Sequence, residues 1–337
     1  MRHHRIVATK AGGPEVLHWI EEDVSPPESG EVLVRVLAAG VSAYDVMVRQ
    51  SRLMPPKPPF TPGVDIVGVV EQLGEGVAGV VRGQRVAALL GFGNGGYAET
   101  LCVPAKDLVP VPEGIDPATA VCLVANYLTA HRVLHADAKI KQGEKVLVQG
   151  AAGGVGTAIL ELGRLLELEM YGTASPSNHE LVKSLGATPI DYKSENVVRR
   201  VRELSGGGVN AAFDHIGGFR QLRSSYRTLA KGGRLVWYGV AASKKHGIRV
   251  IPYSIFTMLF LKLVPDGRKS LLSGDHPEYP QQVLPELFAL LEQGRLAPVI
   301  ADRIPLADAR RAHELVEQGG YQGKFVLTTD AYRGETT

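Results

Sequence analysis

One segment near the middle of the chain, residues 144–156 (Glu-Lys-Val-Leu-Val-Gln-Gly-Ala-Ala-Gly-Gly-Val-Gly), constrains the fold most. Its apolar run, Val146–Val148, is typical of a buried strand in a parallel sheet, because such strands are covered on both faces. A turn of small residues follows, and Val155–Leu166 has the pattern of a helix. A strand, a glycine turn and a helix in this order are where a dinucleotide pyrophosphate binds.

Glycine suits such a turn because it allows a tight bend and a close approach of the backbone to phosphate groups. The helix N-terminus then offers unpaired N–H groups. The spacing of Ala151, Gly154 and Gly156 meets the GxGxxG pattern only loosely, and glycine-rich turns also occur for packing alone. The candidate cofactor-binding residues of the turn are Ala152, Gly153, Gly154, Val155 and Gly156.

After Lys145, short apolar strands alternate with helices, a pattern that indicates βαβ units. The expected strands are Val146–Val148, Leu168–Thr173, Pro189–Asp191, Asn210–Asp214 and Arg234–Tyr238. The expected helices include His179–Leu185, Val197–Leu204 and Phe219–Leu229. This part of the chain is therefore predicted to form a doubly wound parallel sheet.

The N-terminal third instead alternates apolar and polar residues, interrupted by Gly and Pro. Strands are expected at residues 31–39, 65–71 and 84–89, in a partly open antiparallel barrel. Asp116-Pro117 has the form of a helix N-cap followed by Pro in the first turn, and opens an apolar helix through Leu134. Near the end, a helix at 282–293 precedes a strand, a helix and a strand (299–304, 307–317 and 324–327) that can return to the first domain.

Charge and cysteine content exclude several classes of protein. A net charge of +2 over 337 residues gives no basis for binding nucleic acid or an acidic membrane. The apolar stretch Ile255–Val264 is too short to span a bilayer, so no membrane span is expected. Two cysteines, Cys102 and Cys122, are too few for a disulfide framework. With no secretory signal in view, they indicate a reducing, cytoplasmic location.

Several short motifs occur in an order and at separations typical of one family. They are Gly12–Leu17, Gly40–Asp45, Pro62–Asp65, Asn126–Ala130, Ala151–Gly156, Gly172–Ser175, Ile190–Tyr192 and Gly323-Lys324. Through them nearly the whole chain resembles the medium-chain dehydrogenase/reductase superfamily. More narrowly, it resembles the zinc-independent quinone oxidoreductases, including the group similar to the synaptic vesicle protein VAT-1.

The resemblance implies an α/β fold of two domains. A GroES-like, partly open β-barrel catalytic domain is expected at residues 1–120 and 295–337, and a doubly wound, parallel-sheet Rossmann domain at 121–294. Zinc-dependent relatives carry Cys and His at the positions of Ser42 and Val64. Neither residue here is a zinc ligand, since zinc sites use thiolate, imidazole or carboxylate. No metal is therefore expected.

The resemblance also implies the cofactor. NAD-preferring sheets place Asp or Glu at the end of the second strand to bind the ribose hydroxyls, whereas this chain has Gly172, Thr173 and Ser175 there. NADPH is therefore expected, with Ser175 and Tyr192 as inferred contacts of its 2′-phosphate. Relatives add a lysine after that serine, and its absence here leaves the phosphate cation unassigned, with Lys193 as a candidate. Further cofactor contacts implied by the resemblance are Thr129, Gly218, Gly239 and Val240.

Hydride transfer without a metal requires an acceptor that is already electrophilic, and quinones and α,β-unsaturated carbonyls fit. The substrate-orienting candidates are Tyr44, Asn126 and Ser42, although Ser42 is equally placed to be a helix N-cap. Two alternatives stay open. One is an enoyl-thioester reductase, for which Lys244, Lys245 and Arg249 are the hints of a basic entry. The other is an NADPH-binding protein with little turnover and a structural or partner-binding role. Relatives commonly form homodimers through the edge strand of the nucleotide sheet, expected near residues 268–273.

Overall fold

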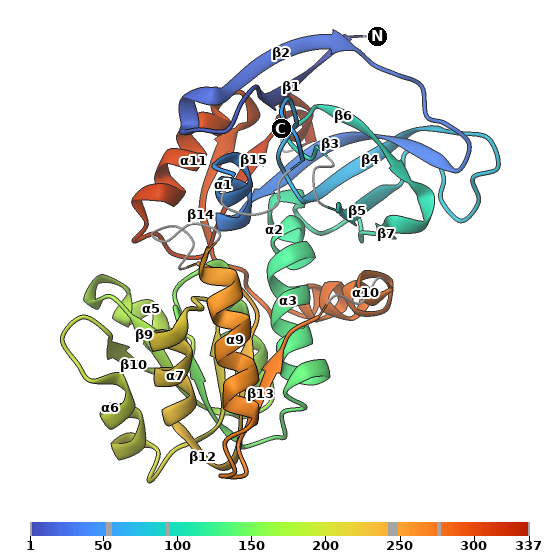
Figure 1. The fold of residues 1–337 in the computed structure, drawn as a ribbon. Helices are drawn as coiled ribbons and strands as arrows, with labels where there is room; N and C mark the ends of the chain where they lie inside the picture. The colour runs from blue at the N-terminus through green and yellow to red at the C-terminus, as the bar shows by residue number, and fades with distance from the viewer. Residues whose placement is uncertain (1, 52–55, 92–94, 242–248, 275–277, 336–337) are drawn as a thin grey trace. The chain divides into compact units, whose positions relative to one another are not determined.

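The computed structural model describes residues 2–51, 56–91, 95–241, 249–274 and 278–335. It divides the chain into two compact units (Figure 1). Unit 1 comprises residues 1–128, 277–319 and 324–337, and unit 2 comprises residues 129–276 and 320–323.

Unit 1 is built on a seven-stranded sheet in the order β14-β15-β3-β4-β5-β7, with β6 paired to β3, and on a separate two-stranded sheet of β1 and β2. Within the larger sheet, β3 pairs antiparallel with β4, β6 and β15, while β14 and β15 run parallel. The strands are β1 Arg2–Ala8, β2 Leu17–Asp23, β3 Glu31–Val41, β4 Asp65–Leu73, β5 Arg85–Leu89, β6 Thr100–Pro104, β7 Leu108–Pro110, β14 Ile300–Pro305 and β15 Lys324–Thr328. The predicted return of the C-terminal strand to the first domain is confirmed, because β15 pairs with β3.

The α-helices of unit 1 include α1 Ala43–Arg49, α2 Pro117–Cys122, α10 Tyr279–Glu292, α11 Ala309–Gln318 and α12 Asp330–Glu335. Shorter helical segments are η1 Pro14–Val16, η2 Ala105–Asp107, η3 Leu123–Tyr127 and η7 Leu306–Asp308. Asp116 caps α2 as predicted, since its carboxylate accepts the Thr119 N–H at 3.0 Å. Residues 121–128 and 278–294, expected in the nucleotide domain, fall in unit 1, because α10 packs against β7 and η3.

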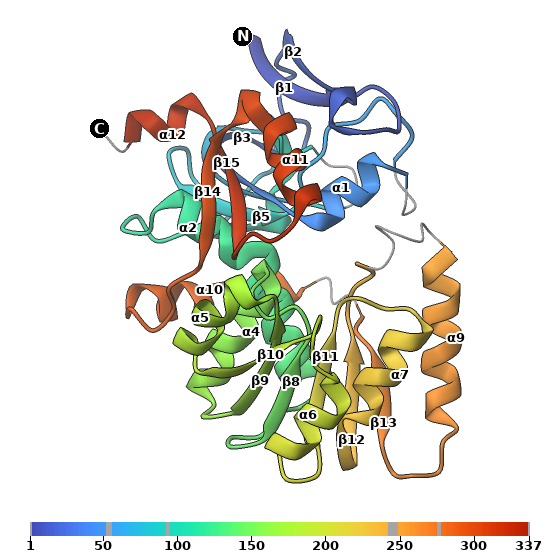
Figure 2. The same cartoon turned by 90° about the vertical axis from the view of Figure 1, so that its left-hand side faces the viewer.

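Unit 2 contains a six-stranded parallel sheet in the order β10-β9-β8-β11-β12-β13, the doubly wound arrangement that the sequence predicted (Figure 2). Its strands are β8 Lys145–Val148, β9 Glu169–Ala174, β10 Ala187–Asp191, β11 Val209–Asp214, β12 Leu229–Trp237 and β13 Lys269–Leu272. The three apolar residues of β8 are fully buried, as expected for a central strand. β13 lies at the edge, where the homodimer contact is expected; that contact stays a prediction.

Helices cover the parallel sheet of unit 2. They are α3 Leu128–His131, η4 Arg132–Asp137, α4 Gly154–Leu165, η5 Pro176–Asn178, α5 His179–Ser184, α6 Val197–Leu204, α7 Phe219–Arg227 and α9 Val250–Lys262, of which α3 starts at the last residue of unit 1. α7 packs against α6, α9 and strands β11 and β12. The apolar stretch at 255–264 lies mostly in α9, and none of the described helices is long and apolar enough to cross a membrane.

Candidate functional site

The order of the strands in unit 2 reverses between β8 and β11, so the connections leave these neighbours in opposite directions. In open parallel sheets, ligands bind in the crevice outside the carboxyl ends of the strands at such a point. The predicted glycine turn follows β8 directly and leads into α4, which begins at Gly154. The turn therefore lies where this fold binds ligands.

The end of β9 holds the glycine turn in place. The Gly150 N–H donates to the Thr173 hydroxyl at 2.9 Å, and the Ala151 N–H donates to the Thr173 carbonyl at 3.0 Å. Gly150 has φ +64°, a left-handed conformation that glycine adopts without strain. The Thr173 hydroxyl donates to the Gln149 side chain at 2.8 Å and is buried. Thr173 thus positions the turn.

Close packing between the turn and the start of α4 requires a glycine at position 156. A Cβ built on Gly156 would lie 2.4 Å from the Gly150 carbonyl oxygen and 2.8 Å from the Ala151 carbonyl carbon, both backbone atoms. The Thr157 N–H makes the first hydrogen bond of α4, to the Gly153 carbonyl at 2.8 Å. The N–H groups of residues 154–156 therefore have no acceptor within the helix. These groups and the positive end of the helix dipole fit a pyrophosphate.

The five residues that follow β9, residues 175–179, include no Asp or Glu. Ser175 is partly exposed and its hydroxyl lies 3.1 Å from that of Ser177. Tyr192, after β10, is 53% exposed, so its ring and hydroxyl are available to a ligand. The neighbouring carboxylate, Asp191, accepts the Lys193 N–H at 3.0 Å and the Ser194 hydroxyl at 2.6 Å, and is therefore satisfied locally. This surface fits a ribose that carries a phosphate.

A buried polar network ties the ends of three strands to α7. The Asp214 carboxylate, which is fully buried, accepts the Ser225 hydroxyl at 2.6 Å and the Ile216 and Gly217 N–H groups at 2.8 and 3.0 Å. Gln149 donates to the same Ser225 hydroxyl at 3.1 Å and accepts from Thr173. Sequence reasoning missed this network, because its members are polar residues in strands and helices far apart in the chain.

The remaining predicted cofactor contacts of unit 2 lie after β11 and β12 or on α3. Gly218 has φ +85°, and its N–H donates to the Ser254 hydroxyl at 2.7 Å. A Cβ on Gly239 would lie 3.0 Å from the His215 carbonyl oxygen, so the chain passes close to the end of β11 here. Val240 packs against the core of unit 2, and Thr129 is partly buried on α3.

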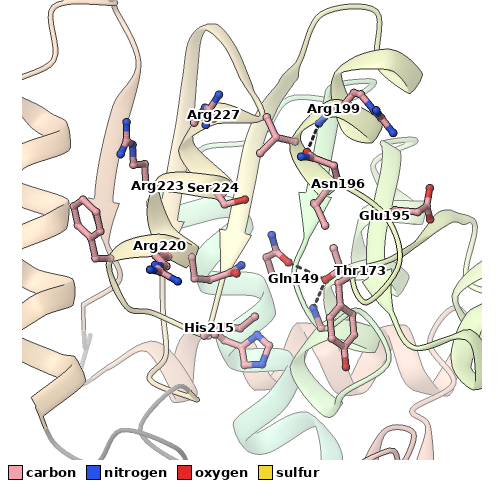
Figure 3. Close-up of a pocket in the computed structure, with 17 residues that line it drawn as sticks. Gln149, Thr173, Glu195, Asn196, Arg199, His215, Arg220, Arg223, Ser224 and Arg227 are labelled. Carbon is pink, nitrogen blue, oxygen red and sulfur yellow. Dashed lines mark hydrogen bonds between the residues drawn. The ribbon is translucent and has the colours of Figure 1, made fainter.

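An open cleft of about 1080 Å³ lies beside these strand ends (Figure 3). Gln149, Gly150, Thr173, His215 and Ile216 form its floor, and residues of α6 and α7 form its walls. Of the predicted cofactor residues, Thr173 and Tyr192 line the cleft. The others that unit 2 contains are not among its lining residues; they are Thr129, Ala152, Gly153, Gly154, Val155, Gly156, Gly172, Ser175, Gly218, Gly239 and Val240.

The substrate-orienting candidates belong to unit 1, on α1 and η3. The Ser42 hydroxyl donates to Asp45 at 2.6 Å and accepts the Asp45 N–H at 3.3 Å, so Ser42 forms a capping box for α1. Tyr44 lies partly exposed in the first turn of that helix. Asn126 is 8% exposed within η3. The N-cap interpretation of Ser42 is therefore confirmed. Of the other two candidates, Tyr44 is more exposed than Asn126.

Ser42 and Val64, the positions at which the sequence resemblance implies zinc ligands in zinc-dependent relatives, carry no thiolate, imidazole or carboxylate. The neighbouring Asp65 pairs with Lys324, with side-chain exposures of 0% and 2%. Among the described residues, no three or more His, Cys, Asp or Glu side chains are grouped to hold a metal ion. The donor types at these positions do not fit a zinc site.

A second buried polar network lies beneath α1 in unit 1. Arg49, which is fully buried, donates to His313 Nδ1 at 3.3 Å and to Glu317. Because a guanidinium has no acceptor, Nδ1 is unprotonated, and His313 Nε2 is left to donate to the Tyr97 hydroxyl at 3.3 Å. Burial and the nearby Arg49 charge lower the pKa of His313 to about 3. Burial also raises the pKa of Asp45, which bonds to Tyr97, to about 6.

We expect His313 to make the stability of the protein depend on pH. Its pKa is lower in the folded state than the ordinary value of 6.5, so the unfolded chain binds more protons between about pH 3 and 6.5. Replacing His313 with Gln removes this contribution. The difference in unfolding free energy between wild type and H313Q should therefore increase by about 3 kcal/mol from pH 4.5 to 7.

Urea denaturation at both pH values measures this difference. Asp45 has the opposite effect, because its raised pKa makes the folded state bind the extra proton, but Asp45 is present in both proteins. A pH-independent difference would show that His313 is not held neutral in the folded state.

Comparison with known proteins agrees with this geometry. Residues 28–113 match the alcohol dehydrogenase GroES-like domain, and residues 185–327 match the zinc-binding dehydrogenase family. The quinone oxidoreductase of Rattus norvegicus is 33% identical over 322 residues, which cover 94% of each chain. The chain therefore belongs to the quinone oxidoreductase family of medium-chain dehydrogenases/reductases. The family is one of oxidoreductases. The family matches and the parallel sheet of unit 2 confirm the predicted GroES-like and Rossmann folds.

Other proteins are similar to this chain over most of its length. The synaptic vesicle membrane protein VAT-1 homolog of Rattus norvegicus is 33% identical, covering 96% of this chain and 83% of its own. The Escherichia coli quinone oxidoreductase, solved in complex with NADPH, has a TM-score of 0.86 at 27% identity, covering 96% of this chain and 99% of its own. Human VAT-1 homolog-like protein has a TM-score of 0.83 at 26% identity, covering 97% of this chain and 98% of its own. The resemblance therefore extends over both units.

Proposed function

We propose that this protein is an NADPH-dependent reductase that transfers hydride to a quinone or an α,β-unsaturated carbonyl without the help of a metal ion. The observation that carries the proposal is that the same chain contains a nucleotide crevice at the strand ends of unit 2 and, in unit 1, residues that cannot bind zinc at the positions where zinc-dependent relatives are expected to bind it. The relatives named quinone oxidoreductase, including the one complexed with NADPH, support it.

The residues of the crevice fit NADPH. The backbone N–H groups at the start of α4 would hold the pyrophosphate, in a turn that Gly156 keeps narrow. Ser175 and Tyr192 would contact the 2′-phosphate, and none of the five residues directly after β9 is a carboxylate that would repel it. When bound, NADPH supplies the hydride.

The side chains of unit 1 limit the acceptor. Because Ser42 and Val64 cannot hold a Lewis acid, the substrate carbonyl receives no activation from a protein-bound zinc ion at this position. A conjugated acceptor needs less activation, since the charge that hydride addition places on its oxygen is delocalised. The Tyr44 hydroxyl and the Asn126 amide are the proposed donors to that oxygen. Ser42 is the weaker candidate, because its hydroxyl already donates to Asp45.

We expect steady-state turnover of NADPH with an ortho- or para-quinone or an enone, undiminished by EDTA. The KM for NADPH should be at least about tenfold lower than that for NADH, because a 2′-phosphate contributes charge-assisted hydrogen bonds. Absorbance at the nicotinamide band, together with metal analysis of the purified protein, measures both.

The alternatives give different results in the same assay. Tight NADPH binding without oxidation by any quinone or enone would favour a binding protein with little turnover. Saturable turnover of crotonyl-CoA would favour an enoyl-thioester reductase. For that second class, Arg249 lies at the start of α9, whereas Lys244 and Lys245 lie outside the described residues. Stoichiometric zinc needed for activity would overturn the proposal.

A further inference from the structure

The cleft beside the strand ends is strongly basic. Four arginines line it, Arg199 on α6 and Arg220, Arg223 and Arg227 on α7, against a single acidic residue, Glu195. Glu195 is already used, since it accepts the Asp191 N–H at 2.8 Å and pairs with Arg200 at 3.2 Å. The cleft therefore carries uncompensated positive charge directly beside the floor of the nucleotide crevice.

The three arginines of α7 form one stripe. They are spaced by three and four residues, which places them along one side of the helix. Within the part of the chain that the structure describes, none of the three forms a salt bridge, whereas Arg199 pairs with Glu203 at 3.5 Å. Exposed, unpaired guanidinium groups on a cleft wall are suited to bind an anion, because they present several donors in a fixed plane.

The position of Arg220 distinguishes it from its neighbours. It lies in the first turn of α7, two residues after Gly218, and in Figure 3 it lies closer to His215 and Gln149 than Arg223 or Arg227 does. Arg227 lies seven residues further on, about 10 Å along the helix axis. Of the unpaired arginines in the cleft, Arg220 is therefore nearest to the strand ends that receive the nucleotide.

Lys193, the candidate cation from the sequence analysis, is less well placed than Arg220 to bind an anion in the cleft. It is exposed after β10, its backbone N–H bonds to the Asp191 carboxylate, and it is not among the residues that line the cleft. Tyr192 does line the cleft, together with the residues of α7. An anion held between Tyr192 and α7 would meet Arg220 and not Lys193.

We propose that Arg220 is the cation that recognises the 2′-phosphate of the cofactor, and that this arginine of α7, rather than a lysine after β9, supplies the positive charge that favours the phosphorylated nucleotide. This inference rests on NADPH as the cofactor in the proposed function, but not on the acceptor. Arg223 adds to the positive field of the cleft, and Arg227 lies too far along the helix to reach the same phosphate.

Binding of two small probes tests this assignment without turnover. Calorimetric titration of the full-length protein with 2′,5′-ADP and with 5′-AMP reports the contribution of the 2′-phosphate alone. For R220Q we expect the Kd of 2′,5′-ADP to rise at least about tenfold and that of 5′-AMP to change less than twofold. R220K should recover part of the loss. R227Q, the matched control, removes the same charge from the same helix and should change neither value by more than twofold.

Three results would overturn the assignment. If R220Q weakens both probes equally, Arg220 contacts the base or ribose and not the 2′-phosphate. If R227Q has the same effect as R220Q, the arginines of α7 attract the phosphate only through their summed positive charge, and Arg220 has no special role. If R220Q changes neither Kd, the cation lies elsewhere. Failure of wild type to prefer 2′,5′-ADP over 5′-AMP would instead reject NADPH as the cofactor, and this inference with it. None of these results depends on finding the hydride acceptor.

Discussion

Replacing Gly156 with Ala is expected to weaken NADPH binding by about 100-fold. The added Cβ would lie 2.4 Å from the Gly150 carbonyl oxygen, and since both clashing partners at this turn are backbone, no side chain can rotate away. The turn or the start of α4 has to shift, which misaligns the N–H groups aimed at the pyrophosphate. Loss of two charge-assisted hydrogen bonds, each worth about 1.5 kcal/mol, corresponds to that change in Kd.

Gly153 provides the control within the same turn. Among the described atoms, its Cβ would meet only the Gly150 carbonyl oxygen, at 3.5 Å, an ordinary contact, and its φ of −78° suits any residue. We expect G153A to bind NADPH within threefold of wild type. Fluorescence titration measures both affinities, and thermal unfolding without ligand shows whether G156A is folded. Equal losses of affinity in G156A and G153A would mean that the clash between the added Cβ and the backbone of the turn is not what weakens NADPH binding.

Replacing Lys324 with Met is expected to destabilise unit 1 by about 3–5 kcal/mol, because it leaves the Asp65 carboxylate buried without its counter-ion. Asp65 is fully buried, and among the described atoms its Oδ1 has no hydrogen-bond partner, so Lys324 is its main compensation. Space around the pair is limited, since a Cβ on Gly40 would lie 2.5 Å from both Lys324 Nζ and Asp65 Oδ1. Water therefore has little room to replace the ammonium group.

The double variant D65L/K324M separates the pair from the packing around it. Removing both charges should recover most of the lost stability, because an apolar pair of similar volume has no desolvation cost. Chemical denaturation at pH 7 gives the four unfolding free energies of the cycle. A single-variant loss below 1 kcal/mol would show that solvent reaches the carboxylate.

The sequence predicted the nucleotide sheet well and its polar interior poorly. Val146–Val148 and the helix at 197–204 were recognised because their patterns are local. The Gln149, Ser225 and Asp214 network could not be recognised, because its members are brought together only by the pairing of β8 with β11 and the packing of α7. Strands β1, β2, β6 and β7 were also missed.

The barrel unit shows the same limit. Strands at 31–39, 65–71 and 84–89 were expected from alternation and were found, each within about two residues at either end. The Arg49–His313 contact joins residues 264 apart in sequence, and neither residue has a local signal of burial. For the candidate site, the glycine turn followed from motif spacing, whereas the basic α7 wall appeared only once α6 and α7 enclosed a cleft.

The pairing of β15 with β3 determines the order in which the protein can assemble during translation. Phe325 pairs with Val41, so the sheet of unit 1 lacks two of its strands until residue 328 has left the ribosome. The six strands of unit 2 are all synthesised by Leu272, and can form their core earlier. During synthesis, the edge of β3 that later pairs with β15 therefore stays without its partner strand. We expect unit 1 to depend more than unit 2 on protection from aggregation while the chain is made.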